Sequence, residues 1–192
     1  MTPKAISNII DAVLSFWFGD PEDPGYGENR EAWFKKDPDF DREIETRFGA
    51  LIADGAAGRL DSMAESPEGA VALVIILDQF PRNIYRGDAR AFAQDAKARA
   101  VAERAIAREF DASLMPVMRK FLYLPFEHSE DLADQDLALK LFTPLGAEDL
   151  EWAEKHRNII AEFGRFPHRN AALGRVSTPE EEAFLARPGS SF

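Results

Sequence analysis

The chain of 192 residues contains no cysteine. Disulfide bonds and thiolate-ligated metal sites are therefore excluded, and nothing in the composition points to an oxidising compartment. Long apolar runs are also missing, because the longest, Ala70 to Leu77, is far shorter than the ~20 residues that a membrane-spanning helix needs. The amino terminus shows no basic segment and cleavage site typical of secretion. We therefore expect a cytoplasmic protein without a membrane partner.

Basic residues are scarce as well. The chain holds 23 lysines and arginines against 34 aspartates and glutamates, so its formal net charge is −11. A surface of this sign repels nucleic acid and anionic lipid headgroups, and we expect neither as a partner. A length of 192 residues with 45% hydrophobic residues suffices for one sizeable core. The sequence thus predicts a single domain over residues 1–192, whose oligomeric state it leaves open.

No segment shows the strict alternation of apolar and polar residues that is typical of a half-buried strand. Apolar residues instead recur at helical spacing, and helix starts are marked by capping residues such as Ser66 before Pro67 and Thr178 before Pro179. The sequence predicts an all-α fold of about eight or nine helices. They are expected over Ile6 to Trp17, around Trp33, from Pro38 to near Gly58, from Ser66 to Phe80, from Asp88 to Phe110, from Ser113 to Leu124, from Leu132 to Phe142, from Glu148 to Phe163 and after Thr178.

The helix that begins at Ser66 is apolar on nearly all sides, which predicts that it lies at the centre of the core. Pro81 disfavours a helical conformation at Phe80, so we expect the helix to end there. A similar turn follows the helix that is expected to end at Phe163. There a glycine at residue 164 and a proline at residue 167 interrupt the helical pattern. The two turns carry the related strings FPRN, at residues 80–83, and FPHRN, at residues 166–170.

Positive charge gathers at these two turns of an otherwise acidic chain. No acidic residue lies between Gln79 and Gly87 or between Phe163 and Val176. Guanidinium and amide groups are donors that suit carboxylate and phosphate groups. We therefore expect a site for an anionic small molecule or an acidic peptide, formed by Arg82, Asn83, Arg86, Arg165, His168, Arg169, Asn170 and Arg175.

A structural interpretation of the same residues is equally open. The segment from Glu127 to Asp136 holds five acids and neither lysine nor arginine, so it could pack against both turns and neutralise them. The asparagines at positions 83 and 170 would then cap the segments that follow. In that case the turns form a closed network in a scaffold protein, and no small ligand is bound.

Histidine next to a carboxylate is the usual equipment of general acid–base catalysis. His128 directly follows Glu127, and His168 stands in the second turn. These three residues are the candidate catalytic groups of a hydrolytic enzyme in which water is the nucleophile and the substrate is a phosphorylated or carboxylated metabolite. His156 lies on the apolar stripe of its helix and is expected to be a hydrogen-bonded core residue. The histidine spacings match no metal-ligand pattern, so we expect neither a metal nor another cofactor.

Three strings carry a resemblance to a known family. They are LDQFPRN at residues 77–83, FLYLPFEHSED at residues 121–131 and GRFPHRN at residues 164–170. The chain resembles a family of uncharacterised bacterial proteins known as a domain of unknown function, over nearly its whole length. The resemblance implies an all-helical, tetratricopeptide-like fold and brings no activity, cofactor or catalytic residue. The 34-residue period of the tetratricopeptide repeat is itself not legible in the sequence.

Overall fold

The helix starts predicted from capping residues are present in the structure. The Ser66 hydroxyl accepts a hydrogen bond from the Gly69 N–H at 3.2 Å, so α3 (Pro67–Val74) begins as predicted. Thr178 and Glu181 form a capping box at the start of α9 (Pro179–Leu185). Local side-chain chemistry therefore places the amino-terminal ends of these helices.

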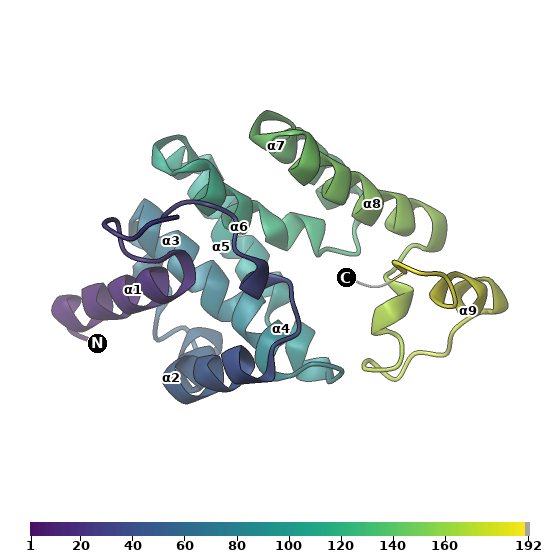
Figure 1. Ribbon diagram of the computed structural model, residues 1–192, viewed down its shortest axis with the longest axis horizontal. Coiled ribbons are helices and arrows are strands. Elements are labelled where there is room, and N and C mark those ends of the chain that lie inside the picture. Colours follow the sequence, from purple (N-terminus) through teal and green to yellow (C-terminus); the bar gives the residue numbers. More distant parts are fainter. Residues whose placement is uncertain (191–192) are drawn as a thin grey trace. The chain divides into compact units, whose positions relative to one another are not determined.

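The computed structural model describes residues 1–190, and no strand occurs among them (Figure 1). The predicted all-α class is confirmed. Because α3 continues into α4 through a π-helical turn, the labelled α-helices form eight continuous rods in the described part of the chain. Besides α3 and α9, the helices are α1 (Pro3–Phe18), α2 (Pro38–Ala56), α4 (Phe80–Ile84), α5 (Asp95–Ala107), α6 (Pro116–Glu127), α7 (Leu132–Phe142) and α8 (Ala147–Phe163).

The central helix does not end at Phe80, so that prediction was wrong. Phe80 has a φ of −57° and a ψ of −42°, and the chain runs from α3 through the π turn η3 (Ile75–Gln79) into α4. The Phe80 N–H donates to the carbonyl of Ile75, five residues back. The wider turn relieves the clash that the Pro81 ring makes with the preceding turn of an α-helix. The predicted central position is confirmed, since residues 70–77 have no exposed surface.

Two further helix boundaries differ from the prediction. The helix expected from Asp88 to Phe110 is reduced to α5, after the 3₁₀ segment η4 (Ala89–Phe92) and before Glu109, whose φ of 57° is left-handed. Alanine-rich sequence favours helix without marking where it stops. The helix α6 passes through Pro125 to Glu127, because a proline in the last turn removes only one hydrogen bond.

Contacts group the chain into two compact units. Unit 1 comprises residues 1–86 and 90–125, and unit 2 comprises residues 87–89 and the chain from Phe126 onward. The single domain over residues 1–192 stays a prediction, and the tetratricopeptide-like arrangement remains an implication of the resemblance. Each unit is described below by itself.

The core of unit 1 is built around α3 and a cluster of aromatic rings. The helix α3 packs against α1, α5 and the 3₁₀ segment η2 (Asp61–Glu65). The contact with η2 is very close, since a Cβ atom on Gly69 would lie 2.0 Å from the Met63 carbonyl oxygen. The rings that pack together belong to Phe16, Trp17, Phe18, Trp33, Phe34, Phe40, Phe48, Phe80 and Phe121.

Unit 2 packs α7 against α8 and holds the second turn beside them. The last turns of α8 contribute Ile159 and Ile160, which are buried with Phe166, two residues beyond the glycine cap of the helix. The rings of Phe163 and Phe184 pack against this cluster, with centroids 5.1 Å apart. Burial of Phe166 therefore anchors the turn that carries His168 and Arg169.

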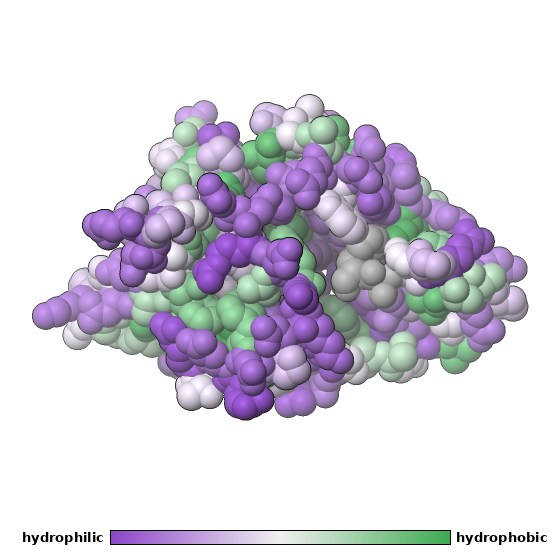
Figure 2. Space-filling view, in the orientation of Figure 1, coloured by the Kyte–Doolittle hydropathy of each residue, from purple (hydrophilic) through white to green (hydrophobic). Residues whose placement is uncertain are grey.

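The face seen in Figure 2 is largely hydrophilic, in keeping with 30% charged residues. Among residues 1–190, no helix is both long enough and apolar enough to cross a membrane.

Candidate functional site

All three histidines of the chain lie in unit 2, and the rings of His156 and His168 lie beside that of Phe166. The His156 ring centroid lies 6.2 Å from that of His128 and 5.6 Å from that of Phe166. The centroid of the His168 ring lies 5.5 Å from that of the Phe166 ring. We call His128, His156, Phe166, His168 and Arg169 the histidine cluster. His128 directly follows α6, His156 lies in the middle of α8, and Phe166 caps the 3₁₀ turn η7 (Pro167–Arg169), which holds His168 and Arg169.

His156 is the buried member of the histidine cluster, with 6% of its surface exposed. Its Nδ1 lies 2.9 Å from the Trp152 carbonyl oxygen and 3.0 Å from Oε1 of Glu127. Burial lowers the pKa of His156 to about 3, so the ring is neutral at neutral pH. A neutral ring with two acceptors at Nδ1 carries its proton there and leaves Nε2 as an acceptor. The prediction of a hydrogen-bonded core histidine is confirmed.

Arg169 adds a guanidinium to the cluster. Its Cζ lies 4.6 Å from the Phe166 ring centroid, and Nη2 donates to the His128 carbonyl oxygen at 3.0 Å. The side chain is buried, whereas the two histidines beside it are half-buried. After burial, the positive charges of His128, His168 and Arg169 further lower the pKa of His156. Arg169 therefore links the second turn to the backbone at His128.

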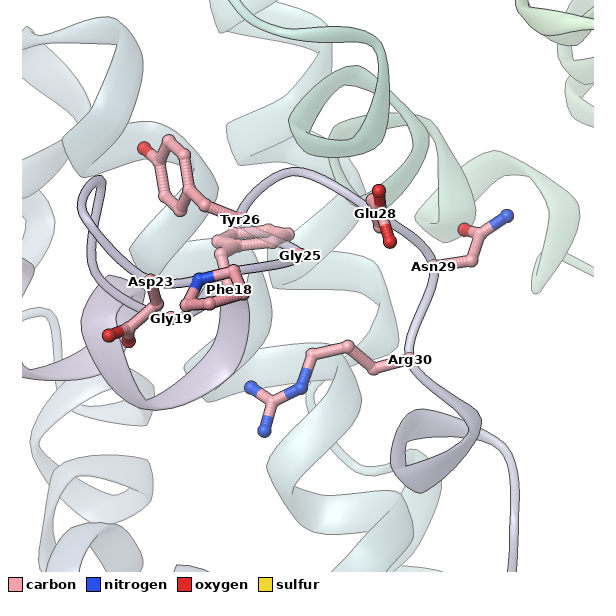
Figure 3. A pocket seen from close by; sticks show the side chains of 9 residues that line it. Phe18, Gly19, Asp23, Gly25, Tyr26, Glu28, Asn29 and Arg30 are labelled. Carbon is pink, nitrogen blue, oxygen red and sulfur yellow. The ribbon is translucent and has the colours of Figure 1, made fainter.

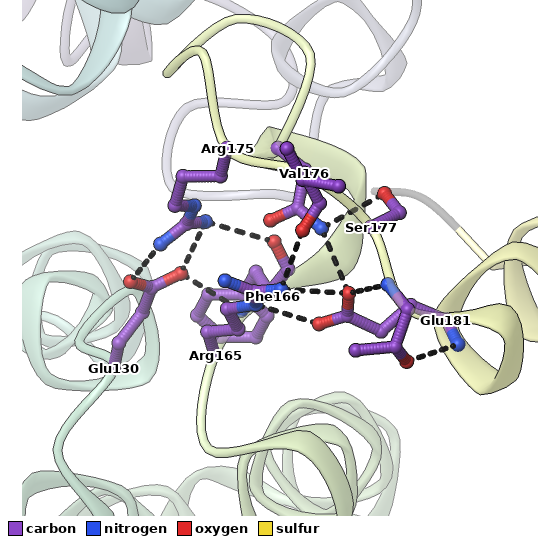
Figure 4. A network of polar contacts seen from close by, with 9 residues as sticks. Glu130, Arg165, Phe166, Arg175, Val176, Ser177 and Glu181 are labelled. Carbon is purple, nitrogen blue, oxygen red and sulfur yellow. Dashed lines mark hydrogen bonds and ion pairs between the residues drawn. The ribbon is translucent and has the colours of Figure 1, made fainter.

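The other basic residues of the second turn are bonded to carboxylates of unit 2, as Figure 4 shows. Arg175 forms a two-pronged ion pair with Glu130 at 2.7 and 2.9 Å, and the Phe166 N–H donates to the same carboxylate. Burial alone would raise the pKa of Glu130, but these bonds hold it below its ordinary value. The expected packing of the acidic segment 127–136 against the second turn is confirmed.

A second carboxylate, that of Glu181, also binds residues of the second turn. The guanidinium of Arg165 donates to both carboxylate oxygens of Glu181, at 2.6 and 2.8 Å (Figure 4). The same carboxylate accepts from the Asn170 amide and from the Thr178 N–H. The Arg165 hydrogen bonds and then the Thr178 N–H lower the pKa of Glu181 to about 2. Glu181 therefore ties the turn to the start of α9.

The first turn finds its carboxylates within unit 1. Arg82 binds Asp95 through two hydrogen bonds of 2.9 Å each, and its Nη1 lies 3.1 Å from the fully buried Asp78. Arg86 and Asn83 both donate to Asp41 on α2, at distances of 2.8 to 2.9 Å. The segment 127–136 is thus not the acidic partner that these bonds use.

Two of the eight residues predicted to bind a ligand, His168 and Arg169, belong to the histidine cluster. The structure joins the other six to protein carboxylates, namely Arg82, Asn83, Arg86, Arg165, Asn170 and Arg175. Their role as ligand-binding groups stays a prediction. Sequence reasoning missed Asp41, Asp95 and Glu181 as partners, because pairing across 13 to 45 residues leaves no local pattern.

The candidate catalytic residues Glu127 and His128 are neighbours in the chain, yet Glu127 is hydrogen-bonded to His156. Among residues 1–190, no group of three histidine, aspartate or glutamate side chains is arranged to hold a metal ion.

Unit 1 contains a pocket of about 250 Å³ that is lined by the end of α1 and the loop after it (Figure 3). Phe18, Tyr26 and Arg30 are among the residues that line it. The Arg30 guanidinium donates to the carbonyl oxygens of Phe16 and Trp17 at 3.0 and 2.8 Å. These bonds satisfy the carboxyl end of α1, so the residue has a structural role here.

The comparisons with known proteins agree with this architecture. A family model described as bacterial protein of unknown function (DUF924) matches residues 13–189. The chain belongs to this family. A solved structure of a protein of unknown function from Agrobacterium tumefaciens is 41% identical in sequence, with a TM-score of 0.85. The match covers 94% of this chain and 98% of the other. No curated protein matches the sequence.

Proposed function

We propose that this DUF924 protein binds a small anionic molecule through His128, His168 and Arg169 of the histidine cluster. The observation that carries the proposal is that two half-buried imidazoles and a buried guanidinium lie beside the rings of His156 and Phe166 in unit 2. The pKa of His156 is lowered in part by their positive charges, which supports a positive potential at the cluster. In a chain of net charge −11, such a potential favours a negatively charged ligand.

The geometry of the cluster suits a ligand of this kind. Phe166 holds the guanidinium of Arg169 by stacking, and the bond to the His128 carbonyl orients it. A group whose orientation is set before binding loses little entropy when a ligand arrives. Imidazole N–H groups and guanidinium N–H groups are donors, and carboxylate, phosphate and sulfate are matching acceptors.

Hydrolysis is a second candidate, favoured by the 3.0 Å contact between Glu127 and His156. A carboxylate that orients an imidazole is the arrangement that general bases use. Because both side chains are buried, a substrate has to present its reacting atom at Nε2 of His156. In this mechanism the pair that activates water is Glu127 and His156, in place of the predicted pair of Glu127 and His128.

Anion titration of the purified full-length protein tests the proposal. Sulfate, phosphate and succinate are titrated at constant ionic strength, and binding is followed by calorimetry. Arg169→Gln is expected to weaken binding about tenfold or more, since a hydrogen bond between charged groups is lost. Arg157→Gln is the matched control, because Arg157 lies on α8 of the same unit and pairs with Asp136.

Circular dichroism shows whether each variant is folded, and His168→Gln gives a second test if Arg169→Gln is not. If no anion causes a measurable heat of binding at millimolar concentration, the proposal is overturned. Equal binding by the wild type and both site variants also overturns it, because the anion then binds elsewhere. Release of product from a panel of phosphate esters, abolished in Glu127→Gln, would instead establish the hydrolytic function.

A further inference from the structure

The pocket of unit 1 is formed by one continuous stretch of chain. All the residues that line it lie between Phe18 and Arg30, at the end of α1 and in the loop after it (Figure 3). Its volume of about 250 Å³ is below the roughly 300–1,000 Å³ that is typical of sites for drug-sized molecules. The pocket therefore suits a ligand that is smaller than a drug.

The loop that lines the pocket has a defined backbone shape. Gly25 and Gly27 have φ angles of 84° and 81°, which glycine adopts without strain. The Glu28 N–H donates to the Gly25 carbonyl oxygen at 3.0 Å and closes a tight turn. Gly27 packs on α6, because a Cβ atom there would lie 3.6 Å from the sulfur of Met115. A site whose shape is set before binding loses less entropy when a ligand arrives.

Arg30 supplies a positive charge to the pocket. Its Nη1 alone donates to the two carbonyl oxygens at the end of α1, so this structural role uses one nitrogen. Within residues 1–190, Arg30 forms no ion pair with a carboxylate, and its Nε and Nη2 atoms donate to no other group. By contrast, Arg82 and Arg86 of the same unit both bind carboxylates. The remaining N–H groups of Arg30 are therefore available to a carboxylate from outside the protein.

The other charged residues that line the pocket are acidic, namely Asp23 and Glu28. One oxygen of Asp23 accepts from the Asp20 N–H at 3.0 Å, whereas the Glu28 carboxylate bonds to no other residue in the described part of the chain. Two carboxylates and one guanidinium give the lining a formal surplus of one negative charge. The carboxylates disfavour a simple anion and Arg30 disfavours a simple amine, so a molecule that carries both charges suits the pocket best.

We propose that this pocket binds a free amino acid, with its carboxylate on Arg30 and its ammonium group on Glu28 and Asp23. The surplus negative charge of the lining favours an amino acid with a basic side chain. Phe18 and Tyr26 provide apolar surface for the methylene groups of that side chain. The site is separate from the anion site proposed above, because all of its lining residues belong to unit 1.

Titration calorimetry with four small molecules tests the charge requirement. L-lysine, L-leucine, L-glutamate and the diamine cadaverine are each titrated into the full-length protein at neutral pH and constant ionic strength. Cadaverine has the two amino groups of lysine but no carboxylate. Lysine is expected to bind most strongly, and glutamate and cadaverine about tenfold or more weakly, because each lacks one of the matching charges.

Substitutions in the loop show whether lysine binds at this pocket. Glu28→Gln should weaken lysine binding about tenfold. Arg30→Lys should do the same, because it keeps the positive charge but loses the forked donor that a carboxylate fits. Glu22→Gln is the matched control, since Glu22 is exposed in the same loop and does not line the pocket. Circular dichroism reports folding, and Glu28→Gln decides the test if Arg30→Lys is not folded.

Three results would overturn the amino-acid site. The first is that lysine causes no measurable heat of binding at millimolar concentration. The second is that cadaverine binds as strongly as lysine, and the third is that lysine binding is unchanged in Glu28→Gln. In the last two cases the acidic surface of the protein attracts the amine elsewhere. None of these results bears on the anion site of unit 2, which is tested with sulfate, phosphate and succinate.

Discussion

His156 Nδ1 lies 3.0 Å from a carboxylate oxygen of Glu127, and both side chains are almost fully removed from solvent. The low pKa of His156 makes this contact a hydrogen bond between a neutral ring and a carboxylate. The carboxylate thus contributes by setting the tautomer and orientation of the ring. This leaves Nε2 as the acceptor atom of the ring.

The titration of His156 predicts a pH dependence of stability. In the unfolded chain His156 binds a proton near pH 6.5, while in the folded protein it does so only near pH 3. The unfolded state therefore gains protons first as the pH falls, and the free energy of unfolding decreases below pH 6.5 by up to about 1.4 kcal/mol per pH unit. Urea unfolding between pH 7 and 5 should show this slope, and His156→Gln should flatten it while lowering stability at pH 7. An unchanged slope in the variant would contradict the neutral state of the buried ring.

Arg165→Ala should lower the melting temperature, because it removes the guanidinium that binds both oxygens of Glu181. The pKa of Glu181 is lowered to about 2, so its bonds stabilise the fold above the ordinary carboxyl pKa near 4.5. That stabilisation is lost as the pH falls from about 4.5 to 2. The difference in melting temperature between wild type and variant should therefore be larger at pH 7 than at pH 3. Arg157→Ala, which breaks a more exposed pair, is expected to shift the melting temperature less.

Arg169→Ala and His168→Ala should differ in stability although the residues are adjacent. Arg169 is buried, stacks on Phe166 and bonds to the His128 carbonyl, so its loss is expected to cost about 1–3 kcal/mol. His168 is half-buried, and its truncation should be close to neutral. Urea denaturation without added anions measures both. Equal and large losses in the two variants would show that the turn is architecture throughout and would weaken the case for a binding site.

Gly69→Ala tests the close packing of α3 on η2. Alanine favours helix over glycine by about 1 kcal/mol, but here its Cβ would lie 2.0 Å from the Met63 carbonyl oxygen. We expect a net destabilisation of several degrees in melting temperature. Gly49→Ala is the matched control, because the nearest atom to its Cβ would be 3.8 Å away and the same propensity gain applies without a clash. Stabilisation by both substitutions would mean that α3 and η2 are farther apart than the structure shows.

Local chemistry in the sequence was sufficient to predict the helices and the residues at which they begin. Ser66, Thr178 and the apolar stripe around His156 each act within one or two turns of helix, so their effects can be predicted from neighbouring residues alone. Helix ends were predicted less well. At Phe80 a π turn accommodates the proline, and packing of the buried helix, which the sequence does not display, stabilises that turn.

The sequence also determined that basic groups gather in two turns, whereas it only suggested that the acidic segment 127–136 could pack against both of them. Only the tertiary structure decided which arginine meets which carboxylate: Arg86 with Asp41 and Arg175 with Glu130 are each 45 residues apart. Charge is a property of composition, whereas pairing depends on which helix faces approach each other. For the same reason the meeting of the His156 and His168 rings at Phe166 could not be predicted, since hydrophobic burial of that ring brings distant segments together.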